Sequence, residues 1–157
     1  MSAWALVPKA WYSWDFSVTA GDRTIARFDL SSWRERGVIT IDGIEHRVFR
    51  ESMLGDFVIE RGSQTLARAT KTSVFTHTMI VRHDGREYML RKPSVWRRAF
   101  VLMDGARQIG SIAPTSVWTR RAAVDLPAQW PLHLQAFVIW LTLVLWKRDA
   151  HAGSGGS

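Results

Sequence analysis

The sequence predicts an all-β domain that ends in one long hydrophobic helix. Three observations support this: short apolar-alternating runs over most of the chain, glycines that recur in the turns between them, and an uninterrupted apolar segment near the C-terminus. The chain has 157 residues, of which 46% are hydrophobic and 22% charged. This length and composition suit a single domain with a substantial core.

The first ten residues contain Trp4, Leu6 and Val7 but no basic region before a long apolar core and no small-residue cleavage pattern. They do not resemble a secretory signal. We expect residues 1–10 to form an N-terminal extension, although this weakly patterned start is also able to supply a strand. We expect the protein to be cytoplasmic and peripheral to the inner membrane surface.

Five hairpins are predicted between residues 11 and 126, because turn glycines recur every 19 to 23 positions. Asp-Gly pairs in three of them tolerate the positive φ angles of two-residue hairpin turns. A further strand is predicted over Ser116–Asp125. The predicted hairpins cover residues 14–30, 38–49, 57–71, 76–91 and 99–112, with turns at Gly21-Asp22, Asp42-Gly43, Arg61-Gly62, Asp84-Gly85 and Asp104-Gly105.

This pattern amounts to eleven or twelve strands. A sheet of that size in a small protein splits into two sheets or closes into a barrel, and closure also removes the exposed edges. Strand periodicity alone leaves the β-sandwich and the barrel equally open.

The C-terminal segment predicts a helix over about residues 131–148. Pro131 suits a first helical turn, and Lys147 and Arg148 complement the C-terminal end of the helix dipole. Residues 136–146 are apolar on every face, so protein or lipid must surround them. The run is shorter than the roughly 20 residues that span a bilayer, which favours burial over a membrane anchor.

A barrel of about twelve strands has a lumen that its own side chains cannot fill, and this helix is a natural occupant. We therefore predict a closed antiparallel barrel of about 12 strands over residues 11–149 around a central helix. Residues 150–157 are expected to form a flexible tail. The helix residues expected in the core are Phe137, Trp140, Leu141, Val144 and Leu145.

The run from Tyr88 to Ile112, the segment Trp118–Arg121 and the terminal helix resemble the tubby C-terminal-like superfamily. That superfamily includes tubby proteins, plant LURP-one-related proteins and phospholipid scramblases, and this chain is most similar to its small bacterial members. The resemblance covers most of residues 11–149 and implies a closed 12-stranded barrel threaded by the C-terminal helix. Tubby domains bind phosphoinositide headgroups through basic residues on the barrel exterior, and scramblases are associated with transbilayer lipid movement and calcium.

A formal net charge of +7 favours acidic partners such as phospholipid headgroups. Nucleic acid is disfavoured, because no recognition helix or aromatic RNA-binding signature accompanies the charge. Arginine is well suited to hold phosphate through charge-assisted hydrogen bonds, whereas a solvated basic surface is the alternative interpretation. The residues predicted to bind an anionic ligand are Arg91, Lys92, Arg97, Arg98, Arg120 and Arg121.

The chain contains nine tryptophans, and this residue favours membrane interfaces because its ring is amphipathic. Trp33 and Trp96 are the candidates for interfacial insertion, since each precedes an arginine in a loop-like position. Packing in the core or at the barrel rim is the alternative for each ring.

Enzymatic chemistry is not expected. The absence of cysteine excludes disulfides, thiolate metal sites and a cysteine nucleophile. His77 and His83 lie six positions apart without a visible third ligand, so no metal is predicted. Nucleophile elbows, glycine-rich phosphate loops, paired catalytic carboxylates and EF-hand-like loops are not found, so neither catalytic residues nor a cofactor is expected.

The function predicted from these observations is a monomeric, non-enzymatic module that binds anionic phospholipid headgroups at a membrane surface. A protein-interaction or structural domain without a lipid ligand is the alternative. A small-molecule carrier would need lumen space that Phe137, Trp140 and Trp146 are expected to fill.

Overall fold

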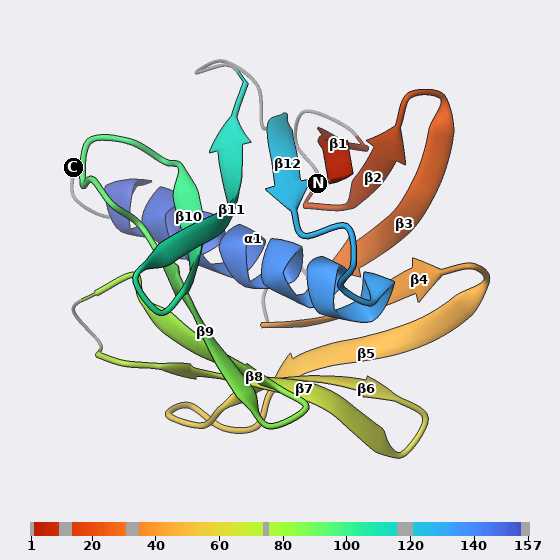
Figure 1. Cartoon of the computed structure of the whole chain (residues 1–157), viewed down its shortest axis with the longest axis horizontal. Helices are drawn as coiled ribbons and strands as arrows, with labels where there is room; N and C mark the ends of the chain where they lie inside the picture. Colours follow the sequence, from red (N-terminus) through yellow and green to blue (C-terminus); the bar gives the residue numbers. More distant parts are fainter. Residues whose placement is uncertain (1, 10–13, 31–34, 74–75, 116–120, 155–157) are drawn as a thin grey trace.

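A computed structural model of the chain contains a closed antiparallel barrel around one helix, which confirms the predicted fold class (Figure 1). It describes residues 2–9, 14–30, 35–73, 76–115 and 121–154. Twelve strands and one helix lie in these ranges: β1 (Ser2–Pro8), β2 (Phe16–Ala20), β3 (Arg23–Leu30), β4 (Arg36–Ile41), β5 (Ile44–Arg50), β6 (Phe57–Arg61), β7 (Gln64–Lys71), β8 (Met79–His83), β9 (Arg86–Arg91), β10 (Phe100–Asp104), β11 (Arg107–Pro114), β12 (Ala122–Leu126) and α1 (Leu132–Ser154).

Each strand pairs with its neighbours in sequence, and β1 closes the barrel by pairing with both β2 and β12. Leu6 pairs with Val18 on one side and Ala122 on the other, and its side chain is fully buried. The expectation that residues 1–10 form an extension outside the barrel was therefore wrong. Closure requires this strand, because without it β2 and β12 would expose unpaired backbone groups.

The five hairpin turns fall into two classes that alternate along the chain. Asp42-Gly43 and Asp84-Gly85 have positive φ at both residues, as a type I′ turn requires. In the other three turns, only the first residue has positive φ, as in a type II′ turn. These first residues are Gly21, Gly62 and Gly105. The barrel therefore repeats in units of two hairpins, which the near-regular glycine spacing did not reveal.

Two predicted turns are displaced by one residue. The sequence placed one at Asp104-Gly105, but Asp104 pairs with Arg107, so the turn consists of Gly105 and Ala106. Arg61 likewise pairs with Gln64, which moves that turn to residues 62–63. Both hairpins contain a register shift, as does the β2–β3 hairpin, because a β-bulge adds one residue to one strand of a pair.

α1 begins after Pro131, whose carbonyl oxygen accepts hydrogen bonds from the backbone N–H groups of Leu134 and Gln135. The helix continues to Ser154, so part of the predicted tail is helical. The extra turns contain Asp149, which contacts His77 and Lys92 on the barrel. These tertiary contacts hold the helix beyond the end that its apolar pattern predicted.

The core of the protein lies between α1 and the inner face of the barrel. All five helix residues predicted to face it are buried: Phe137, Trp140, Leu141, Val144 and Leu145.

Aromatic contacts join α1 to the wall. Trp140 meets Phe57 of β6 edge-on at 5.8 Å between ring centroids, and Trp146 lies 6.4 Å from Phe100 of β10. β7 also approaches the helix, and its inward positions include the small residues Ala67 and Ala69. Within the described part of the chain, no helix has the length and hydropathy needed to cross a membrane.

Three histidines lie close to the first turns of α1. His133 Nε2 is 3.3 Å from His83 Nε2, and the buried His46 donates from Nδ1 to the carbonyl oxygen of Ile44. Burial, followed by the nearby His83 and His46, lowers the pKa of His133 to about 4. His133 is therefore neutral in the folded protein at neutral pH.

Replacing Trp140 with alanine should lower the free energy of unfolding by about 3–5 kcal/mol, because the barrel cannot collapse around the lost indole. Denaturant unfolding followed by circular dichroism measures this. Trp96→Ala is the matched control: that ring is 90% exposed, so a change within about 0.5 kcal/mol is expected. Equal losses in the two variants would contradict a packed lumen.

His133 should make the fold less stable in mild acid. Its pKa falls from about 6.5 in the unfolded chain to about 4 in the fold, so between these values the unfolded state binds the extra proton. Stability is thus lost as the pH drops from 6.5 to 4, by about 1–2 kcal/mol after allowance for solvent screening.

Unfolding curves at pH 7 and pH 4 test this expectation. His133→Leu should reduce the difference between the two pH values, whereas substitution of the exposed His151 by glutamine should leave it as in the wild type. An unchanged difference in His133→Leu would contradict the assignment.

Candidate functional site

The two ends of the barrel differ in their connections. Tight turns close the end near the start of α1, whereas longer connections surround the other end, where the C-terminal turns of α1 emerge (Figure 1). We call the latter the loop end. Its described residues are 9, 14–15, 35, 51–56, 72–73, 76–78, 92–99, 115 and 121.

The loop end carries the most exposed large hydrophobic side chains among the described residues. Met53 and Leu54 are 88% and 84% exposed in the β5–β6 connection, and Val95 and Trp96 are 83% and 90% exposed in the β9–β10 connection. Each of these two connections therefore exposes a pair of neighbouring apolar side chains at the same end of the barrel.

Hydrogen bonds within each connection hold these side chains outward. In the β5–β6 connection, Glu51 N–H donates to the Asp56 carbonyl oxygen, and Arg50 Nε donates to that of Gly55. In the β9–β10 connection, Trp96 N–H donates to Ser94 Oγ. The apolar tips are therefore part of ordered turns.

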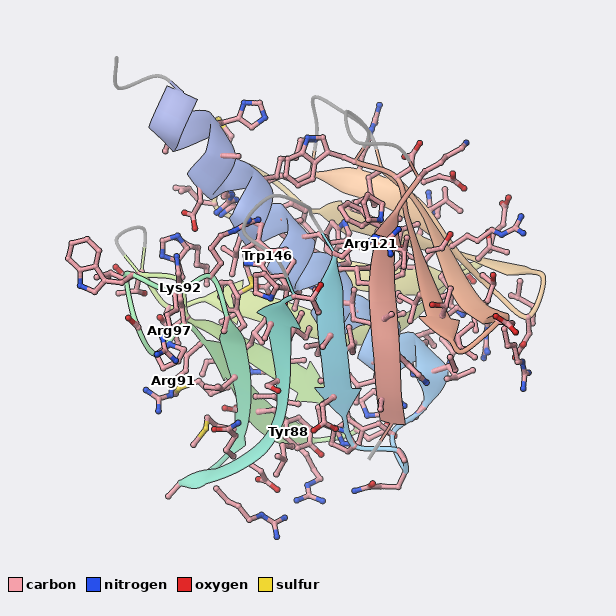
Figure 2. All side chains as sticks on the ribbon, turned by 90° about the horizontal axis from the view of Figure 1, so that it is seen from above. Tyr88, Arg91, Lys92, Arg97, Arg121 and Trp146 are labelled. Atoms are coloured by element: carbon pink, nitrogen blue, oxygen red, sulfur yellow. The ribbon has the colours of Figure 1, made fainter. Side chains whose placement is uncertain are left out.

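Four predicted anion-binding residues lie at the start of this second connection or within it. Figure 2 shows Arg91, Lys92 and Arg97 on the same side of the barrel, and Arg98 follows Arg97 directly. Arg121 begins the approach to β12, which β10 and β11 separate from β9. Arg120 and Trp33 lie outside the described residues.

The predicted cations differ in their electrostatic partners. Lys92 Nζ lies 3.2 Å from Asp149 Oδ2, and only 12% of its side chain is exposed. The Arg98 guanidinium lies 5.2 Å from the centroid of the Trp146 ring. Within the described residues, no carboxylate forms an ion pair with Arg91, Arg97, Arg98 or Arg121, so these groups leave the surface strongly positive.

A second cationic cluster at the loop end was not predicted from the sequence. Arg148 of α1 forms a two-point contact with Glu35, with 2.7 Å between Nη2 and Oε2, and Arg50 lies 3.6 Å from the same carboxylate. Burial lowers the pKa of Lys71, which Arg148 and Arg50 lower further, and burial also lowers the pKa of Lys147. The sequence indicated Lys147 and Arg148 as a basic pair at the end of the helix, but it did not indicate the neighbouring Arg50 or Lys71.

A pocket of about 660 Å³ opens between α1 and the β9–β10 connection. Its wall combines the rings of Trp14 and Trp146 with the cations Lys92 and Arg98. Asp149 also lines it and accepts hydrogen bonds from Lys92 Nζ and, over 2.5 Å, from His77 Nε2. The sequence did not predict this pocket, because its residues come from distant segments.

The arrangement can bind an anionic group. The described part of the chain has no group of three or more histidine, aspartate or glutamate side chains able to hold a metal ion. Cations beside aromatic walls offer charge-assisted hydrogen bonds and apolar contact to one ligand.

No protein-family model, curated protein or solved structure matches the chain. The site must therefore be interpreted from its own residues.

Glu35 should be important for holding the emerging helix against the barrel. Glu35→Gln removes the charge that Arg148 and Arg50 share, and a loss of about 1–2 kcal/mol in unfolding free energy is expected. Glu87→Gln is the control, because the Arg82–Glu87 pair is largely exposed and should contribute less than about 0.5 kcal/mol. Indistinguishable stabilities of the two variants would show that the Glu35 contact does not hold the helix.

Proposed function

We propose that this protein is a non-enzymatic module that binds anionic phospholipid surfaces through the loop end of its barrel. One observation carries the proposal: the most exposed apolar side chains of the described residues share this end with arginines that no described carboxylate neutralises. A bilayer with anionic headgroups complements both features at once.

The β5–β6 and β9–β10 connections supply the apolar part of the contact. Met53 and Leu54 in one, and Val95 and Trp96 in the other, would enter the boundary between headgroups and acyl chains. Tryptophan is favourable at that depth because its ring is amphipathic. The central helix would stay inside the barrel, so binding requires no opening of the core.

Arg91, Arg97 and Arg98 supply the electrostatic part. Each cation close to an anionic surface contributes about 1 kcal/mol, and this attraction declines within a Debye length. We therefore expect the loop end to contact the membrane, with the barrel axis closer to the membrane normal than to the membrane plane. Binding at the inner membrane surface agrees with the localisation and the lipid ligands that the tubby-like resemblance implies.

A protein partner is the second candidate function, because exposed Met53, Leu54, Val95 and Trp96 would also suit an apolar patch on another protein. Such a partner would be captured regardless of lipid charge. The unneutralised arginines beside Val95 and Trp96 favour the membrane.

Sedimentation with vesicles tests the lipid proposal. The protein should bind vesicles that contain phosphatidylserine, bind neutral phosphatidylcholine vesicles weakly, and dissociate as salt rises. Arg91→Gln/Arg97→Gln should weaken binding about 30-fold at low salt, since two cations contribute about 2 kcal/mol. Trp96→Ala should weaken it about tenfold through lost apolar contact.

Arg23→Gln/Arg107→Gln is the matched control. It removes the same charge from the end of the barrel that the tight turns close, which we call the turn end, and both arginines are exposed there. Vesicle binding should be nearly unchanged in this variant. Equal recovery on neutral and anionic vesicles, or insensitivity to salt, would reject the proposed function. An equal loss in the control would reject the loop end as the contact surface.

A further inference from the structure

The pocket beside α1 contains two cationic side chains. Lys92 presents its ammonium there with only 12% of the side chain exposed, and Arg98 borders the same space. A positive charge so far removed from water requires an anion close to it. Asp149 is the only described carboxylate within ion-pair distance of Lys92.

Asp149 is the anion that Lys92 contacts in this structure. Its two oxygens contact different donors: Oδ1 lies 2.5 Å from His77 Nε2, and Oδ2 lies 3.2 Å from Lys92 Nζ. An ammonium group has three hydrogens, and Asp149 accounts for one of them. Lys92 can therefore serve a second acceptor without releasing Asp149.

Arg98 supplies the other cation. Its guanidinium lies over the Trp146 ring, and Trp146 Nε1 donates to the Arg98 carbonyl oxygen over 2.7 Å. These interactions position the arginine against α1, and no described carboxylate pairs with it. A planar guanidinium held in this way suits the oxygens of a phosphate group.

The remaining wall selects for an apolar portion of the ligand. Trp14, Val95 and Trp146 line the pocket together with the two cations. Figure 2 shows Lys92 beside the C-terminal half of α1, which contains Trp146. The volume of about 660 Å³ lies within the range of small-ligand sites. The helix continues to Ser154, so the partial negative charge of its last turn lies beyond the pocket.

We propose that this pocket binds a phosphate group that carries an apolar substituent, and that the nearby negative charge of Asp149 weakens this binding. The phosphate lies between Lys92 and Arg98, and the substituent lies against Trp14 and Trp146. The proposal rests on the proposed function in assigning the phosphate to the headgroup of a membrane lipid. Free phosphate offers the same charged group without the apolar part.

Three soluble probes separate these sources: hexyl phosphate, inorganic phosphate and hexanol, each titrated against the full chain by calorimetry. Hexyl phosphate should bind more tightly than inorganic phosphate, and hexanol should not bind measurably. Asp149→Asn should strengthen hexyl phosphate binding about tenfold, because it removes the carboxylate charge that repels the phosphate. Arg98→Gln should weaken it about tenfold, as expected when one charge-assisted hydrogen bond to the phosphate is lost.

Equal affinity for inorganic and hexyl phosphate would overturn the lipid assignment. Binding of hexanol as tight as that of hexyl phosphate would overturn the phosphate site. Unchanged affinity for hexyl phosphate in Arg98→Gln would also overturn the phosphate site. Because Arg98 is exposed, this variant should still fold even if Asp149→Asn destabilises the helix end.

The vesicle experiment remains independent, because Arg91 and Arg97 do not line the pocket. Vesicle binding without hexyl phosphate binding would overturn the pocket proposal and leave the proposed function in place. Hexyl phosphate binding without vesicle binding would overturn the proposed function and the assignment of the phosphate to a membrane lipid, and it would leave the phosphate site in place.

Discussion

The need to enclose a helix that is apolar on every face constrains the whole architecture. Residues from Leu134 to Trp146 of α1 are buried without interruption, so no face of this stretch is left to contact water. An open sheet could cover only one side of it. The twelve strands close around the helix instead, and even the N-terminal strand is needed to complete the wall.

Enclosure of the helix also makes the two ends of the barrel unequal. At the turn end, the five two-residue hairpin turns, each with a positive-φ glycine, leave little surface beyond the strands. At the loop end, the emerging helix brings Arg148 to Glu35 and Asp149 to His77 and Lys92. Charged groups from distant parts of the sequence are therefore concentrated where α1 emerges, beside connections with exposed apolar tips.

The candidate site could be predicted only in part. Adjacent cations in the sequence, such as Arg97 and Arg98, were apparent as doublets, and Trp96 was apparent as their neighbour. Whether such residues have carboxylate partners depends on the fold: Lys92 is paired with Asp149, 57 residues further along the chain. Met53 and Leu54 carried no signal, because an apolar pair between strands looks the same in sequence whether it is buried or exposed.

By itself, the sequence predicted the five hairpins, the central helix and the closed barrel. Hairpin periodicity and a helix that is apolar on every face are local patterns with few packing solutions. The sequence did not determine that Ser2–Pro8 closes the wall, since one fully buried side chain, Leu6, is too little periodicity to identify a strand. Only the tertiary structure decided the extension of α1 to Ser154 and the pocket. These features depend on interactions between residues far apart in the chain, and a linear pattern carries no record of such interactions.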